Sequence, residues 1–158
     1  MTRSYSQNML KIVEDYRKAG QPWPTTAKRI AAWAIQNDLW KPQASRILTL
    51  CADLVAKSMR EEYIIDPQGR KVRAKHAAMI KKGDEQLTIW GDIRSEGREH
   101  MEIAFKQRRN QVVGDCHQLK TDVDSFNDNR SPRNPIPMLF DFTDDLAEIE
   151  AVEKNEAA

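Results

Sequence analysis

Cysteine, glycine and long apolar runs are all scarce in this chain of 158 residues. Its two cysteines, Cys51 and Cys116, are too few for a disulfide framework, and both lie among apolar residues at helical spacing. We therefore expect reduced cysteines buried in a core. No run approaches the roughly 18 apolar residues of a membrane span, and residues 1–8 lack the apolar stretch of a signal peptide. We expect a cytoplasmic protein with no membrane partner.

Sequence patterns that support catalysis or cofactor binding are also missing. The chain has no glycine-rich phosphate loop, no paired-cysteine motif and no Ser/His/Asp set at usable spacing. Glu96, Glu99 and His100 form the one dense group of metal-ligand types, and neither His76 nor His117 completes a site with it. The helix dipole explains Glu96 and Glu99 equally well, because carboxylates near the start of a helix are stabilised by its positive end. We predict no catalytic residue, no metal and no cofactor.

What the sequence does contain is opposite charge in its two halves. Residues 1–83 hold 16 Lys and Arg against 7 Asp and Glu, whereas residues 84–158 hold 9 against 17. From Arg70 to Lys82 there are six basic residues and no acid. Such a block repels itself unless a polyanion or an acidic partner neutralises it. This distribution favours a nucleic acid as the partner of the first half.

Apolar spacing predicts three helices in the first half. The first covers about residues 5–19, and the second is capped by Thr25 or Thr26 and extends to about Asn37. The third is expected to begin at Pro42, because a proline at the first helical position loses no hydrogen bond. Its apolar stripe is expected to face inward and consists of Ile47, Leu48, Cys51, Leu54, Val55 and Met59.

A change from helical to alternating periodicity predicts a β-hairpin after the third helix. Residues 63–65 lead into the turn Asp66-Pro67-Gln68-Gly69, in which proline fixes φ and glycine accepts a positive φ. The returning strand is expected over residues 70–75. On it, Lys71, Arg73 and Lys75 share one face.

The second half begins with a short strand or extended segment, expected at residues 86–93. A long helical pattern follows. Its apolar residues recur at seven-residue intervals, at Phe105, Val112, Leu119 and Phe126. Two interpretations stay open: residues 101–126 form the seam of a homodimer, or this helix packs back on the three-helix core. Arg108 and Gly114 interrupt the pattern.

Residues 128–158 are predicted to form a proline-containing linker and an acidic tail. Thr143 is the expected cap of a short amphipathic helix in this tail. The tail serves solubility or is disordered, or it covers the basic surface, or it docks on a protein partner. The candidate partner-binding residues are Phe140, Phe142, Leu146 and Ile149.

The order of these elements resembles that of a winged helix-turn-helix DNA-binding domain. The resemblance covers about residues 5–80 and depends on the turn at residues 40–43 and the Asp66–Gly69 wing. The expected fold class is therefore mainly α with a small β-hairpin (α+β). We expect a winged-helix domain at residues 5–80, then an extended segment with a long helix at residues 84–127, and the tail at 128–158.

This resemblance implies a non-enzymatic protein that binds double-stranded DNA, such as a bacterial transcriptional or mobile-element regulator. In such domains the third helix enters the major groove and the wing contacts phosphates. Carried over by position, Gln43, Ser45, Arg46 and Thr49 face bases or nearby phosphates, with Arg46 suited to reading guanine and Gln43 adenine. The phosphate-facing residues are Lys28, Arg29, Lys41, Arg70, Lys71, Arg73 and Lys75. The alternative is a protein-interaction adaptor whose basic hairpin binds an acidic partner.

Overall fold

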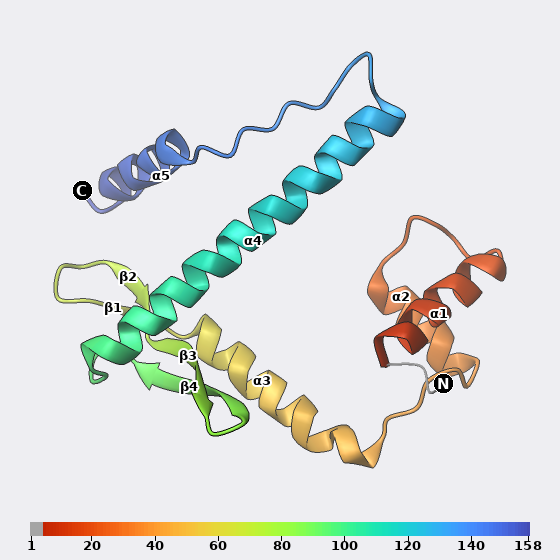
Figure 1. The fold of residues 1–158 in the computed structure, drawn as a ribbon, viewed down its shortest axis with the longest axis horizontal. Helices are drawn as coiled ribbons and strands as arrows, with labels where there is room; N and C mark the ends of the chain where they lie inside the picture. The colour runs from red at the N-terminus through yellow and green to blue at the C-terminus, as the bar shows by residue number, and fades with distance from the viewer. Residues whose placement is uncertain (1–4) are drawn as a thin grey trace. The chain divides into compact units, whose positions relative to one another are not determined.

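The computed structural model describes residues 5–158, so residues 1–4, part of the segment used to exclude a signal peptide, lie outside the described residues. The chain is mostly helical and contains two small antiparallel sheets (Figure 1). The prediction of an α+β protein is confirmed. The chain divides into two compact units, one up to Lys57 and one from Ser58 onward. No helix among the described residues is long and apolar enough to cross a membrane.

The first unit is organised around a buried tyrosine. Helix α1 (Tyr5–Lys18) packs against helix α2 (Ala27–Gln36), close to the predicted bounds. Tyr16 of α1 is fully buried, and its ring meets the ring of Trp33 edge-on at 5.5 Å between centroids. Its hydroxyl donates a hydrogen bond to the carbonyl of Pro22 at 3.3 Å. This aromatic pair fixes the angle between the two helices.

The start of α2 follows the predicted capping rule. Thr26 has an extended backbone, and its hydroxyl oxygen accepts a hydrogen bond from the amide of Arg29 at 3.2 Å. This satisfies one of the four amides that a helix start leaves without a partner. Of the two threonines proposed as the cap of this helix, Thr26 is therefore the one that caps it.

The third helix begins later than predicted. Gln43 is extended, a 3₁₀ turn (η1, Ala44–Arg46) follows, and α3 covers Ile47–Glu61. Pro42 therefore precedes the helix rather than opening it. The reason is that the amide of Arg46 donates to the carbonyl of Gln43, which forms a tighter three-residue turn before the α-helix begins.

The apolar stripe of α3 does not face inward. Ile47 is 65% exposed and Leu48 is 81% exposed, and no residue of the helix is buried. Cys51 is exposed and Cys116 is partly exposed, so neither is the core cysteine that we predicted. Helical periodicity indicates that a face is apolar, but it does not say that the same chain covers that face.

The predicted β-hairpin is present in the second unit. Strand β1 (Tyr63–Ile65) pairs antiparallel with strand β2 (Lys71–Arg73). In the turn, the Asp66 carboxylate accepts hydrogen bonds from the amides of Gln68 and Arg70. Gly69 has a φ of +84°, which glycine adopts without strain. The turn residues thus act as their types predicted.

A second hairpin was only half predicted. Strand β4 (Glu85–Asp92) confirms the extended segment expected at residues 86–93, and it pairs antiparallel with strand β3 (Lys75–Lys82). The first hairpin ends at Arg73, so Lys75 begins a new strand instead of sharing a face with Lys71. The buried Ala74 links the two sheets, because its amide donates to Glu62 and its carbonyl accepts from Ile93.

Helix α4 (Arg98–Arg130) packs its N-terminal part on β3. Ala104 is buried, and the side-chain amide of Gln107 makes two 2.7 Å hydrogen bonds with the backbone of Met79. At Gly91 of β4, an added Cβ would clash with the side chains of Glu96 and His100. Only glycine therefore lets the start of the helix approach the sheet so closely.

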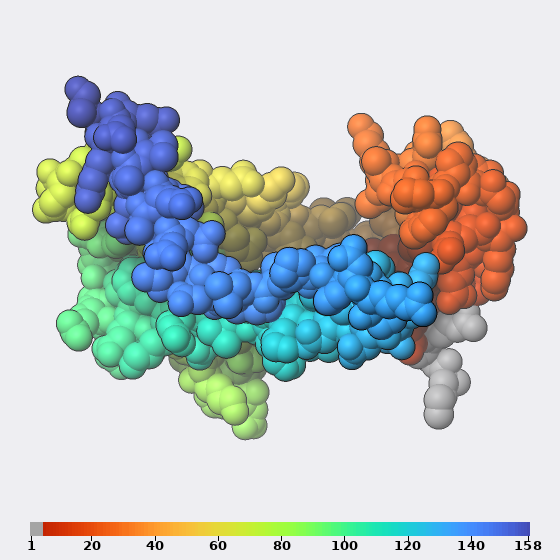
Figure 2. Space-filling model, turned by 90° about the horizontal axis from the view of Figure 1, so that it is seen from above, coloured from red at the N-terminus to blue at the C-terminus, as the bar shows by residue number. Residues whose placement is uncertain are grey.

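The C-terminal segment turns back after α4 and ends in helix α5 (Thr143–Glu156), as Figure 2 also shows. The side chain of Asn127 holds the turn, because it donates to the carbonyl of Ile136 and accepts from its amide. Thr143 is the first residue of α5 rather than its cap. Asp141 instead accepts hydrogen bonds from the amide and hydroxyl of Thr143, and this lowers the pKa of Asp141.

Candidate nucleic-acid interface

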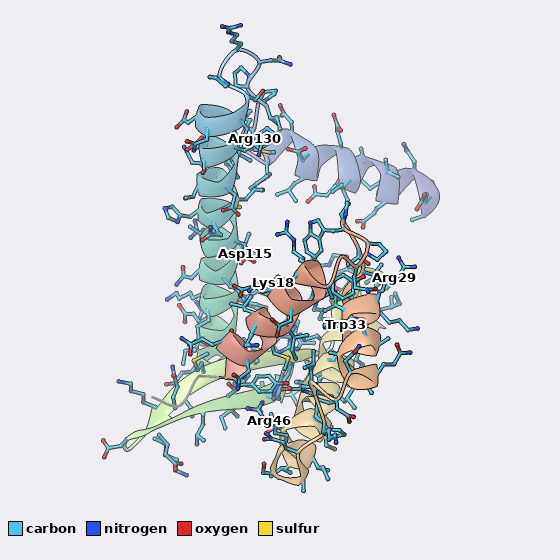
Figure 3. The ribbon with its side chains drawn as sticks, turned by 90° about the vertical axis from the view of Figure 1, so that its right-hand side faces the viewer. Lys18, Arg29, Trp33, Arg46, Asp115 and Arg130 are labelled. Carbon is cyan, nitrogen blue, oxygen red and sulfur yellow. The ribbon has the colours of Figure 1, made fainter. Side chains whose placement is uncertain are left out.

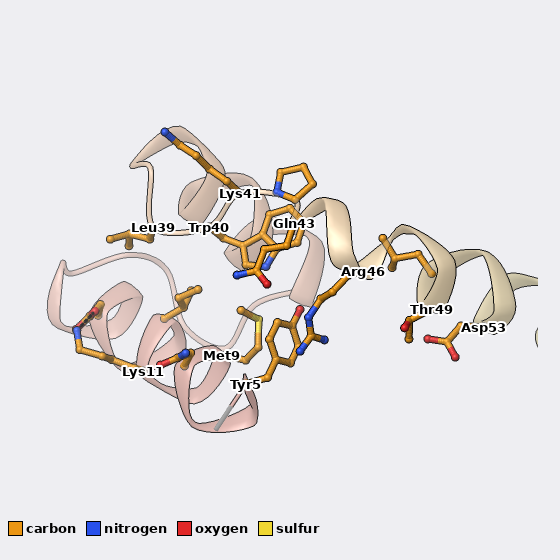
Figure 4. Close-up of a pocket in the computed structure, with 15 residues that line it drawn as sticks. Tyr5, Met9, Lys11, Leu39, Trp40, Lys41, Gln43, Arg46, Thr49 and Asp53 are labelled. Atoms are coloured by element: carbon orange, nitrogen blue, oxygen red, sulfur yellow. Dashed lines mark hydrogen bonds and ion pairs between the residues drawn. The ribbon is translucent and has the colours of Figure 1, made fainter. Parts of the chain in front are cut away.

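The first unit contains a cleft of about 410 Å³ between α1, the 39–43 loop and the start of α3 (Figure 4). Its apolar lining includes Met9, Leu39 and Trp40. On its polar side lies an ion pair between Lys11 and Asp15 at 2.7 Å. The cleft thus combines apolar surface with charges of both signs.

Three of the four predicted base-reading residues line this cleft. They are Gln43, Arg46 and Thr49, whereas Ser45 lies on the same turn outside the lining. The guanidinium carbon of Arg46 lies 3.6 Å from the ring centroid of Tyr5 in a cation–π contact (Figure 4). The structure therefore brings the predicted readers together and gives Arg46 a partner that sequence reasoning missed.

The cations of α2 have a different environment. Lys28 and Arg29 are exposed, and no carboxylate among residues 5–158 forms an ion pair with either side chain. Figure 3 labels Arg29 on α2. Lys41, in the following loop, pairs with Asp38 at 3.0 Å, and both side chains are more than 70% exposed. Exposed pairs of this kind contribute little energy and open readily.

The cations of the first hairpin are largely engaged within the chain. Arg70 donates from Nε to Asp66 at 2.7 Å, and hydrogen bonds from the Arg70 backbone and side chain lower the pKa of Asp66. Lys71 places its ammonium 4.9 Å from the ring centroid of Tyr63. Arg73 forms no ion pair with a described residue, and its carbonyl oxygen lies 2.9 Å from Nε2 of His76.

Lys75 is the most strongly anchored of the predicted phosphate contacts. Its ammonium bridges Asp92 at 2.9 Å and Glu62 at 3.1 Å, and only 27% of its side chain is exposed. The hydrogen bonds to Asp92 and then to Glu62 raise the pKa of Lys75. Arg94 also binds Asp92 and holds the pKa of this carboxyl well below its usual range. Lys75 is thus a structural link between the hairpins.

The tip of the second hairpin carries two cations that sequence reasoning did not select. Lys81 and Lys82 are exposed, and neither forms an ion pair with any residue in the described part of the chain. Gly83 follows with a φ of +64° and forms the turn. The sequence analysis did not predict strand β3, so it did not place these two lysines at the tip of a hairpin.

The histidines have structural roles at the interface of α4 and β3. His76 is 7% exposed, its Nε2 lies 2.9 Å from the carbonyl of Arg73, and its ring packs edge-on against Phe105. Nε2 of His100 lies 2.9 Å from the carbonyl of His76. Glu96 precedes α4 and contributes to no metal group, since residues 5–158 bring no three ligand side chains together.

The predicted partner-binding residues of the tail lie on a surface that the chain itself covers little. The rings of Phe140 and Phe142 meet edge-on at 6.4 Å. Leu146 and Ile149 on α5 are each more than half exposed. The structure thus leaves the apolar side of α5 accessible.

Comparisons with protein-family models, curated proteins and solved structures find no match to this chain. The resemblance to winged-helix domains therefore depends on the order of helices and hairpin alone.

Proposed function

We propose that this chain is a non-enzymatic double-stranded DNA-binding protein whose first half supplies the contact surface. The observation that carries this proposal is that several exposed cations within residues 5–83 have no carboxylate partner among the described residues. They include Lys28, Arg29, Lys81 and Lys82. Phosphates attract such side chains without sequence preference, because binding releases the counterions of the duplex.

The residues at the start of α3 supply the sequence preference in this proposal. Arg46 reads a guanine through two hydrogen bonds, and Gln43 reads an adenine in the same way. Arg46 must first leave the ring of Tyr5, a contact worth about 0.5–1 kcal/mol at an exposed site. A good bidentate base contact is worth about 1–3 kcal/mol, which exceeds that cost. The role we favour is transcriptional or mobile-element regulation in a bacterium.

The test is fluorescence anisotropy of the full chain against a random-sequence duplex, repeated over a salt series. We expect the logarithm of the affinity to fall with the logarithm of salt at a slope near −0.9 for each phosphate contacted. Absence of binding at low salt would refute the proposal. The variant Lys28→Ala should reduce the slope, whereas Lys154→Ala on the acidic helix α5 is the matched control.

A second function is favoured by the ion pairs around the two hairpins. Arg70 of the first hairpin and Lys75 at the start of β3 bind carboxylates of their own chain, at Asp66, Glu62 and Asp92. Carboxylates of an acidic protein partner could replace these internal ones. In this alternative the chain is an interaction adaptor. Salt-sensitive binding to an acidic peptide, with no binding to any duplex, would favour it.

A further inference from the structure

Helix α4 extends well beyond the sheet on which it packs. It has 33 residues and is therefore on the order of 50 Å long. Ala104, which contacts the sheet region, is its single buried residue. Beyond it, an apolar stripe remains 45–51% exposed, at Phe105, Val112, Leu119 and Phe126. Large apolar side chains repeated along one helix face indicate a surface that another molecule covers.

The spacing within this stripe is that of a two-helix seam. Cys116 and Val123 lie between the seven-residue positions, so apolar residues alternate by four and three from Val112 to Phe126. This mean spacing of 3.5 residues keeps a row in contact with a parallel partner helix that supercoils around it. The chain's own C-terminal segment reaches the stripe at one layer, where Ile136, Met138 and Phe140 line a small hollow with Val123.

We propose that a second copy of this chain covers the stripe, with the two α4 helices parallel and in register. The charges beside the stripe select this direction. In the parallel pair Asp115 of each copy faces Lys120 of the other, and the exposed ion pair of Lys120 with Asp124 of its own helix opens at little cost (Figure 3 labels Asp115 midway along α4). Antiparallel helices can also align their apolar layers. One such register brings Asp115 against Asp122, and another brings Lys106 against Lys120. Parallel pairing therefore gives two attractive contacts where antiparallel pairing gives repulsive ones.

The seam has a defined end. Arg109 occupies the next seam position before Val112, and its long side chain reaches water from there. Contact between the copies therefore covers about two heptads. Cys116 forms the second of the five layers of this seam, so each Cys116 lies opposite its equivalent in the second copy. This arrangement is independent of whether the chain binds DNA.

The first test uses the two cysteines. In the full chain, Cys51→Ser leaves only the thiol of Cys116, and Cys116→Ser leaves only that of Cys51. Copper-phenanthroline in air removes two electrons and two protons from a pair of facing thiols and joins them as a disulfide. We expect covalent dimers from Cys51→Ser and not from Cys116→Ser. No dimer from Cys51→Ser, or equal amounts from both variants, would overturn the proposal.

The second test measures the dimer without cross-linking. Sedimentation of the full chain should show a concentration-dependent dimer, and Leu119→Asp should raise its dissociation constant by at least about tenfold, because an unpaired carboxylate is disfavoured in an apolar interface. Val152→Asp is the matched control, since Val152 is similarly exposed on α5 and has no assigned role. A chain that is monomeric at every concentration, or an equal effect of both variants, would contradict the pairing. Circular dichroism establishes that each variant keeps its helices.

A charge exchange tests the direction of the pair. Asp115→Lys and Lys120→Asp should each weaken the dimer, because each puts like charges opposite one another. The double variant restores opposite charges between parallel helices and should recover most of the affinity. A double variant no better than the single ones would refute the parallel register.

Discussion

Two groups of cations in this chain, one on α2 and one around the hairpins, differ in how they are paired. In the first unit, Lys28 and Arg29 are exposed and pair with no carboxylate of the described chain. In the second unit, Arg70 and Lys75 are held by carboxylates that lie near them in the fold. The two sets look alike in composition. The comparison shows that a count of basic residues gives only the total positive charge. The ion pairs within the chain show which of these cations remain available to bind a partner.

The units also differ in how they are held together. The first depends on one buried aromatic contact, between Tyr16 and Trp33. The second is held by two paired hairpins, by the docking of α4 on β3 and by the ion pairs around Asp92. Loss of one side chain should therefore affect the first unit more than the second.

The largest effect is expected for Tyr16→Ala. Removing a fully buried aromatic side chain costs about 3–5 kcal/mol, because burial is lost and a cavity remains. We expect amide hydrogen exchange to become fast in α1 and α2 while β3 and β4 stay protected. Tyr16→Phe is the control, and it should cost only about 0.5–1.5 kcal/mol through the lost hydrogen bond to Pro22. Equal loss of protection in both units would mean that they unfold together.

In the second unit the most sensitive position is Gly91. The added methyl group of Gly91→Ala meets Glu96 and His100, so the start of α4 must move away from β4. Overpacking of this kind typically costs about 1–3 kcal/mol, measurable by urea unfolding.

Gly114→Ala is the matched control for that substitution. No other atom lies within 4 Å of the new Cβ, and the position is inside α4. Alanine should therefore stabilise the chain by about 0.5–1 kcal/mol, since it loses less backbone entropy than glycine. If both substitutions changed stability in the same direction, the close approach at Gly91 would be in doubt.

Local signals in the sequence predicted local structure well. The cap at Thr26 and the turn at Asp66–Gly69 were correct, because each depends on a side chain and a backbone group a few residues apart. The same holds for the bounds of α1. The late start of α3 was missed because a 3₁₀ turn and the first turn of an α-helix use the same residues.

Contacts between distant residues were not predictable in this way. Lys75 was assigned to phosphate because its neighbours in sequence are basic, yet the strand register places it opposite Asp92. The contact of Arg46 with Tyr5 joins positions about 40 residues apart and has no local signal. The sequence thus predicted which residues belong to the candidate site, but not which side chains contact one another there.

The difference between paired and unpaired cations can be tested on DNA. Arg29→Ala should weaken all duplexes alike and lower the salt slope by about one unit, as expected for a phosphate contact. Arg70→Ala should change the slope less, because Arg70 is already bound to Asp66. Anisotropy titrations at several salt concentrations measure both. Equal changes would show that the ion pair to Asp66 opens on binding and that both hairpin and helix contact phosphates.

The smallest effect concerns acid stability in the second unit. Hydrogen bonds from Arg94 and Lys75 hold the pKa of Asp92 below its ordinary value of 3.8. A carboxyl with a depressed folded-state pKa stabilises the fold above its unfolded pKa, and this contribution is lost as the pH falls through the folded value. Thermal unfolding of Asp92→Asn should therefore depend less on pH below about 4 than that of the wild-type chain. Glu148→Gln, which removes a carboxylate outside this ion-pair group, should follow the wild-type curve. If Asp92→Asn also followed it, Lys75 would be free to exchange its carboxylates for phosphate, and the contrast between paired and unpaired cations would lose its main support.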